Sequence, residues 1–102
     1  MTGVKPPLST KTVTLTAEEW FNSGYSKGES GDNQGAIADY NQAINLKPDY
    51  SLAYYNRGVD KDNLGDKQGA IAEYNKAAQL YSQQNKMDDY LDALNQVKKL
   101  QK

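Results

Sequence analysis

The chain of 102 residues contains no cysteine and no histidine. Their absence excludes disulfides, thiol nucleophiles, catalytic triads with an imidazole base, and the ligands that zinc, copper and most redox irons prefer. The sequence offers no other base, nucleophile or metal-ligand set that outranks a structural explanation of the same residues. We therefore predict that the protein is not an enzyme and binds no cofactor or metal.

Long apolar runs are also missing, and the longest has four residues, Leu52 to Tyr55. A helix that crosses a bilayer needs about 20 apolar residues, so we expect no membrane insertion. The first 16 residues contain no apolar core of signal-peptide length, which favours a cytoplasmic location.

Large apolar side chains are scarce, because Leu, Val, Ile and Phe together number 17, below the ~20% at which composition begins to suggest disorder. The net charge is only −1, so composition alone does not distinguish a folded domain with few large apolar residues from a polar tail. The charge is unevenly distributed: residues 17–97 hold seven basic and 13 acidic side chains, and both ends are basic. An acidic body repels phosphate backbones, so we expect no nucleic-acid partner.

An internal repeat favours the folded domain. Residues 31–46 (GDNQGAIADYNQAINL) and residues 65–80 (GDKQGAIAEYNKAAQL) agree at 11 of 16 positions. Gly31 and Gly65, each followed by Asp, combine a left-handed helix stop with an N-cap for the next helix. Apolar residues recur at helical spacing after each turn, so each unit predicts two antiparallel helices. A core of Tyr, Trp, Ala and Gly then explains why large aliphatic residues are few.

Start and stop signals divide the chain further. Thr16 and Glu19 form a capping box at the start of the first helix, and Asp49 stands after Pro48 where it could cap the third. A last helix over 87–100 has polar outer faces that suit the end of a stack. We predict an all-α fold of antiparallel helix-turn-helix repeats with about five helices. Its parts are a flexible N-terminal tail (residues 1–15) and a domain at 16–102, with repeat one at 17–50, repeat two at 51–84 and a capping helix at 86–101.

Small and large residues are matched within each unit, because Gly24 and Gly58 leave space that Tyr40 and Tyr74 can fill. The signature of the 34-residue tetratricopeptide repeat occurs here as Trp20, Gly24, Ala36, Tyr40, Ala43 and Pro48. It recurs as Tyr54, Gly58, Ala70, Tyr74 and Ala77, with Ser82 in place of the proline. The sequence thus resembles the tetratricopeptide repeat family, and the wording GAIADYNQAI is similar to repeats of cyanobacterial proteins. The resemblance implies a helical solenoid that acts as a non-enzymatic scaffold for protein binding.

In tetratricopeptide arrays, the first helix of each unit lines a concave groove. The resemblance places eight residues there: Phe21, Asn22, Tyr25 and Gly28 from unit one, and Tyr55, Asn56, Val59 and Asp62 from unit two. Aromatic rings beside amides suit an extended peptide or a helix, and the acidic body favours a neutral or basic, partly apolar partner. A family subclass clamps the C-terminal carboxylate of heat-shock chaperones with two lysines and two asparagines, but only Asn56 matches that clamp.

Three alternatives stay open. Phe21 and Tyr55 could serve packing within the array instead of partner binding. Two repeats make a short stack, so the chain could self-associate as a homodimer. The segment from Asp60 to Gly65 begins like a calcium-binding loop, but Leu64 and Ile71 occupy positions that need oxygen ligands, which favours a helix end.

Overall fold

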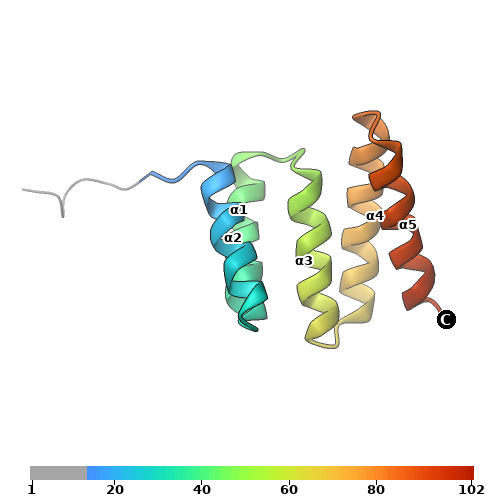
Figure 1. Ribbon diagram of the computed structural model, residues 1–102, viewed down its shortest axis with the longest axis horizontal. Helices are drawn as coiled ribbons and strands as arrows, with labels where there is room; N and C mark the ends of the chain where they lie inside the picture. The colour runs from blue at the N-terminus through green and yellow to red at the C-terminus, as the bar shows by residue number, and fades with distance from the viewer. Residues whose placement is uncertain (1–13) are drawn as a thin grey trace, which may run out of the picture.

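The computed structural model describes residues 14–102, which form five α-helices (Figure 1). They are α1 (Ala17–Glu29), α2 (Asn33–Leu46), α3 (Ser51–Asn63), α4 (Lys67–Gln83) and α5 (Met87–Leu100). The predicted all-α fold is confirmed. Most of the predicted flexible tail, residues 1–13, lies outside the described residues.

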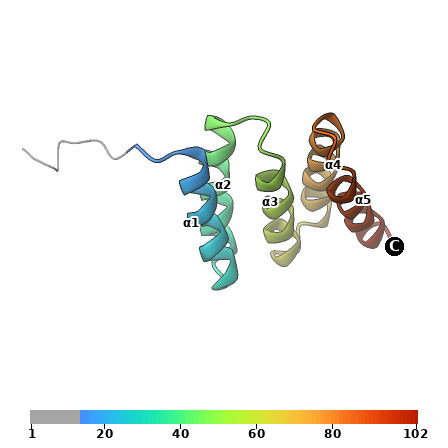
Figure 2. The ribbon, with the colours of Figure 1, turned by 45° about the horizontal axis from the view of Figure 1, so that its top comes forward.

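The helices follow one another in a row from α1 to α5, and each packs against the next in the chain (Figures 1 and 2). A further contact joins α1 to α3, the first helices of the two repeats. This arrangement is the predicted helix-turn-helix solenoid. Within residues 14–102, no helix combines the length and apolar character that a membrane span requires.

Local signals at the start of α1 and at the turns before α2 and α4 act where the sequence predicted them. The Thr16 hydroxyl oxygen accepts from the Glu19 N–H at 3.1 Å, and the Glu19 carboxylate accepts from the Thr16 N–H at 2.9 Å. Gly31 and Gly65 have φ values of 92° and 89°, the left-handed conformation that glycine adopts without strain. The segment from Asp60 to Asn63 is helical, so it does not form a calcium-binding loop.

Gly35 and Gly69 lie in the first turns of α2 and α4, where intrinsic propensity disfavours glycine. The Asp32 carboxylate accepts a hydrogen bond from the Gly35 N–H at 2.9 Å, and Asp66 accepts from the Gly69 N–H at 2.8 Å. A Cβ atom at either glycine would overlap the capping carboxylate. These glycines therefore allow the aspartate caps to sit close to the helix ends.

The start of α3 differs from the prediction that Asp49 would cap it. Tyr50 is the N-cap residue, and no side chain caps this helix. The Tyr50 N–H donates to the Lys47 carbonyl at 3.0 Å, so Asp49 lies inside a tight turn, one residue too early to act as the cap. At the end of α4, Asn85 with φ 60° takes the place of the turn glycines.

The core consists mainly of alanine and tyrosine. Tyr40 is 1% exposed, and an added Cβ at Gly24 would lie 2.9 Å from its ring. Tyr74 fills the space beside Gly58 in the same way, since a Cβ there would lie 3.2 Å from the ring. The predicted pairing of small with large residues is confirmed, and it brings α2 close to α1 and α4 close to α3.

Candidate functional site

A hollow of about 90 Å³ opens between α1, α2 and α3. Its walls come from Tyr25, Gly28 and Glu29 on α1, Tyr40 on α2, and Asn56, Val59, Asp60 and Asn63 on α3. The α3 residues are spaced three and four apart, so they form one stripe along that helix. We call this feature the Asp60 hollow.

Four of the eight predicted groove residues line the Asp60 hollow, namely Tyr25, Gly28, Asn56 and Val59. Tyr25 is 51% exposed and Val59 37% exposed, so both present apolar surface to solvent. Asn22 is exposed outside the hollow. Asp62 also lies outside it, where its carboxylate pairs with the Lys67 ammonium at 3.5 Å.

Phe21 is half-buried among aromatic rings at the junction of the two repeats. Its ring centroid lies 5.2 Å from that of Tyr50, 5.5 Å from that of Tyr40 and 6.4 Å from that of Tyr25. Aromatic pairs at such separations stabilise a fold beyond their buried area. Phe21 therefore packs against aromatic rings within the array.

Tyr55 is also half-buried, and it joins α3 to the C-terminal half of the array. Its ring packs edge-on against Tyr74 at 5.1 Å, and its hydroxyl donates a hydrogen bond to Asp92 of α5 at 2.9 Å. Burial, with the Asp92 carboxylate nearby, raises the pKa of Tyr55, so the hydroxyl stays protonated at neutral pH. Like Phe21, this ring serves internal packing.

The sequence analysis did not place four lining residues in the groove, namely Glu29, Tyr40, Asn63 and Asp60, of which Asp60 is the most unusual. It is only 4% exposed, and no hydrogen bond or ion pair joins its carboxylate to another described residue. The carboxylate reaches solvent through the hollow that it lines. Burial, followed by repulsion from Glu29, raises the pKa of Asp60 to about 6. Its position four residues after Asn56 on one helix is the sequence signal that places it in the groove.

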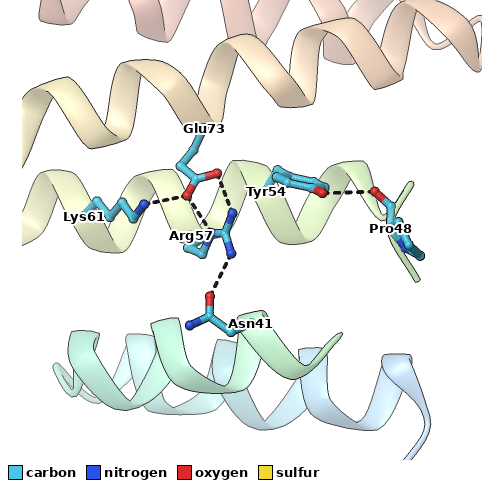
Figure 3. Close-up of polar contacts among 6 residues, drawn as sticks. All are labelled: Asn41, Pro48, Tyr54, Arg57, Lys61 and Glu73. Atoms are coloured by element: carbon cyan, nitrogen blue, oxygen red, sulfur yellow. Dashed lines mark hydrogen bonds and ion pairs between the residues drawn. The ribbon is translucent and has the colours of Figure 1, made fainter. Parts of the chain in front are cut away.

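The other buried carboxylates of the described chain are paired with cations. Asp39 accepts from Lys27 at 3.0 Å and also bonds Ser23. At the matching position of the second repeat, Glu73 contacts Arg57 at 2.6 Å and Lys61 at 2.7 Å (Figure 3). Each ion pair connects the two helices of its own repeat. Asp39 and Glu73 are 34 positions apart, which is the repeat length, and this offset is the sequence signal for matching ion pairs in the two repeats.

Arg57 also links the two repeats. Its guanidinium donates to the Asn41 side-chain oxygen on α2 at 2.7 Å while it holds Glu73 on α4 (Figure 3). This planar side chain therefore ties three helices together, as its fork of donors allows. The Asp60 hollow and the Arg57 network are separate features, because none of the network residues lines the hollow.

A second hollow, of about 460 Å³, lies at the other end of α3 and is lined by residues that include Tyr50, Leu52 and Tyr81. Residues 14–102 contain no group of three or more His, Cys, Asp or Glu side chains that could hold a metal ion. The Asp60 hollow is small and acidic and has exposed apolar surface at its edge, which suits recognition of another molecule.

Comparisons with known proteins agree with this architecture. A family model described as TPR repeat matches residues 24–59, and one described as tetratricopeptide repeat matches residues 52–84. A solved structure described as "Crystal structure of MamA" superposes with a TM-score of 0.61 and 22% identity over 84% of this chain. A second, "Crystal structure of MamA protein", gives 0.60 and 22% over 83% of this chain. At this identity the likeness concerns the fold alone.

The chain spans 58% and 54% of the lengths of those two solved chains. The search of curated proteins finds no significant match.

Proposed function

Because the chain belongs to the tetratricopeptide repeat family, whose members are protein-interaction modules, we propose that it binds a segment of a partner protein across α1 and α3. The observation that carries this proposal is the Asp60 hollow, which lies where these two helices meet. Tyr25 and Val59 expose apolar surface at this place. A partner segment that covered them would bury that surface and gain free energy.

The chemistry of this face favours a neutral or basic, partly apolar partner segment. Asp60 and Glu29 make the hollow acidic, while Asn56 and Asn63 offer side-chain amides to a peptide backbone. Tyrosine is a common anchor in protein interfaces because it buries a large area at a low cost in entropy. The segment therefore combines apolar contact with Tyr25 and Val59 and polar contact within the hollow.

The test is affinity capture of a partner from a lysate of the source cells, with the wild-type chain and a Tyr25→Ala/Val59→Ala variant as baits. Both residues are exposed, so we expect the fold to survive and the captured partner to decrease strongly. Phe21 and Tyr55 are less suitable positions because each supports the core. Leu46→Ala is the matched control, since Leu46 on α2 is 56% exposed and does not line the hollow. Equal capture by all three baits would refute the proposal.

A second candidate function is self-association through α5. Met87 and Leu91 are 51% and 54% exposed and lie one helical turn apart. A second copy that covered them would extend the stack at its C-terminal end. Light scattering over a range of concentrations tests this idea: a mass that rises toward twice 11.3 kDa and falls with Leu91→Glu would support it. A constant monomer mass would exclude it.

A further inference from the structure

The three buried carboxylates of the described chain differ in whether a cationic side chain contacts them. Asp39, Asp60 and Glu73 are 5%, 4% and 5% exposed. Asp39 and Glu73 each contact at least one cationic side chain within the array. Asp60 has no such partner among residues 14–102, although burial without a partner is costly for an ionised carboxylate. The Asp60 carboxylate is therefore a buried negative charge that no cation of the described chain neutralises.

The surroundings of Asp60 add to the negative potential. Glu29 is the second acid of the hollow, and no lysine or arginine belongs to its described walls. Titratable groups on three neighbouring helices sense the Asp60 charge: Glu29 on α1, Tyr40 on α2 and Tyr74 on α4. Burial, with Asp60 contributing, raises the pKa of both tyrosines, so neither hydroxyl carries a compensating charge at neutral pH.

The shape of the hollow restricts what can reach Asp60. Gly28 faces the carboxylate, and a Cβ at this position would lie 2.9 Å from Asp60 Oδ1. The absence of a side chain lets the carboxylate lie close to α1 at the wall of the hollow. The exposed ring of Tyr25 lines the same hollow, where it suits the methylene stem of a long side chain. A hollow of about 90 Å³ has room for the end of one side chain.

We propose that the Asp60 hollow is a socket for a single lysine or arginine side chain of the partner segment. This inference rests on the proposed function, because that segment must cross α1 and α3. The ammonium or guanidinium group pairs with the Asp60 carboxylate, as Lys27 does with Asp39 inside the array. A divalent metal ion is a poorer occupant, since the described chain provides no set of three acidic or imidazole ligands here.

The socket is tested first without any partner, by NMR on the full 15N-labelled chain. The probe is Nα-acetyl-lysine methylamide, and Nα-acetyl-norleucine methylamide is the control with the same stem and no charge. We expect the lysine probe to shift the amide signals of Gly28, Asn56 and Asp60, and the norleucine probe to leave them unchanged. The matching arginine probe shows which cation the socket prefers. No shift up to the solubility limit, or equal shifts with norleucine, would overturn the proposal.

Two charge-neutralising variants sharpen the test. Asp60→Asn keeps the shape and removes the charge, so the response to the lysine probe should be lost. Asp62→Asn makes the same change in net charge on the same helix, outside the hollow, and should keep the response. Lowering the pH from 7.5 to 5 should weaken the wild-type response, because Asp60 becomes protonated while the probe stays charged. A response that Asp60→Asn retains would overturn the assignment of this carboxylate.

Selection from a displayed peptide library separates this inference from the proposed function. Peptides that need both Tyr25 and Asp60 and share one basic residue would support both. Peptides that need Tyr25 and Val59, yet bind Asp60→Asn equally well, would support partner binding and overturn the socket's role in it. If the lysine probe binds but no selected peptide depends on Tyr25 or Val59, the socket stands and the proposed function fails.

Discussion

The carboxylate of Asp60 on α3 faces the backbone of Gly28 on α1, so closely that a Cβ at residue 28 would lie 2.9 Å from Asp60 Oδ1. A residue with no side chain on one repeat thus makes room for a buried acid on the next. The two residues are 32 positions apart in the chain, and the contact between α1 and α3 brings them together. The consequences of this pairing, and of the packing around it, can be measured.

Gly24→Ala and Gly28→Ala should have different effects although both glycines lie on α1. At Gly24 the added methyl meets the Tyr40 ring at 2.9 Å and the Ala36 carbonyl oxygen at 3.1 Å. We expect a loss of about 1 to 3 kcal/mol in the free energy of unfolding, because a packed core cannot easily move. At Gly28 the methyl meets the end of one side chain, and alanine is the better helix former, so stability should change by less than about 1 kcal/mol. Urea denaturation of both variants measures this difference, and equal losses would contradict it.

Asp60→Asn should stabilise the protein at neutral pH and not at pH 4. Folding raises the pKa of Asp60 from 3.8 to about 6, so the folded chain binds more protons than the unfolded chain between these values. The contribution of Asp60 to stability therefore falls as the pH rises through this window and stays low above it. We expect Asp60→Asn to raise the free energy of unfolding by about 1 to 2 kcal/mol at pH 7.5.

The measurement compares wild type and Asp60→Asn by urea denaturation at pH 4 and pH 7.5. Because the other carboxylates titrate in both proteins, the difference in their free energies of unfolding reports the contribution of residue 60. A difference that is the same at both pH values would contradict the prediction. Asp62→Asn is again the control, because Asp62 is partly exposed and paired with Lys67 across a surface turn.

Arg57→Met should destabilise the junction between the repeats. Arg57 contacts Glu73 at 2.6 Å and Asn41 at 2.7 Å, and Lys61 would remain as the one cation beside Glu73. We expect a loss of about 1 to 3 kcal/mol, smaller than for a fully orphaned buried charge. Lys67→Met should cost less than about 0.5 kcal/mol, because its pair with Asp62 is exposed. Thermal unfolding followed by circular dichroism ranks the two variants, and the reverse order would show that the network is not needed for stability.

Tyr55→Phe should cost about 1 kcal/mol, since it removes the hydrogen bond to Asp92 but keeps the ring against Tyr74. Tyr55→Ala should cost about 3 kcal/mol or more because it also empties the packing site. Hydrogen exchange measured on α5 should show the larger increase in Tyr55→Ala. If Tyr55→Ala were as stable as wild type, the ring would not support the core.

The helix boundaries were predictable because their causes are local. A capping box at Thr16, glycines with positive φ at Gly31 and Gly65, and aspartate caps act within a few residues, and the sequence displays them directly. The capping residue of α3 was not predicted correctly, because the turn after Pro48 places Asp49 one residue too early to cap the helix. The role of Gly35 was not predictable from the sequence, because it depends on the distance between residue 35 and the Asp32 carboxylate.

The candidate site was predictable only in part. The family resemblance identified the helices that form the face, and Tyr25, Gly28, Asn56 and Val59 line the hollow that the structure shows. It also selected Phe21 and Tyr55, which are half-buried among other aromatic rings. An aromatic residue on a first helix looks the same in sequence whether its ring faces solvent or a neighbour.

The sequence by itself determined the repeat, the helices and the small-large pairing of the core, because periodicity and capping are properties of short segments. The scarcity of large aliphatic residues is consistent with this core, in which alanine lets helices approach and tyrosine fills the remaining space. Tertiary structure alone decided which charges are neutralised. Lys27 and Arg57 reach Asp39 and Glu73 across a helix pair, whereas Asp60 is buried at a repeat junction where no residue of 14–102 offers it a cation. Burial and pairing depend on neighbours far along the chain, and no local pattern records them.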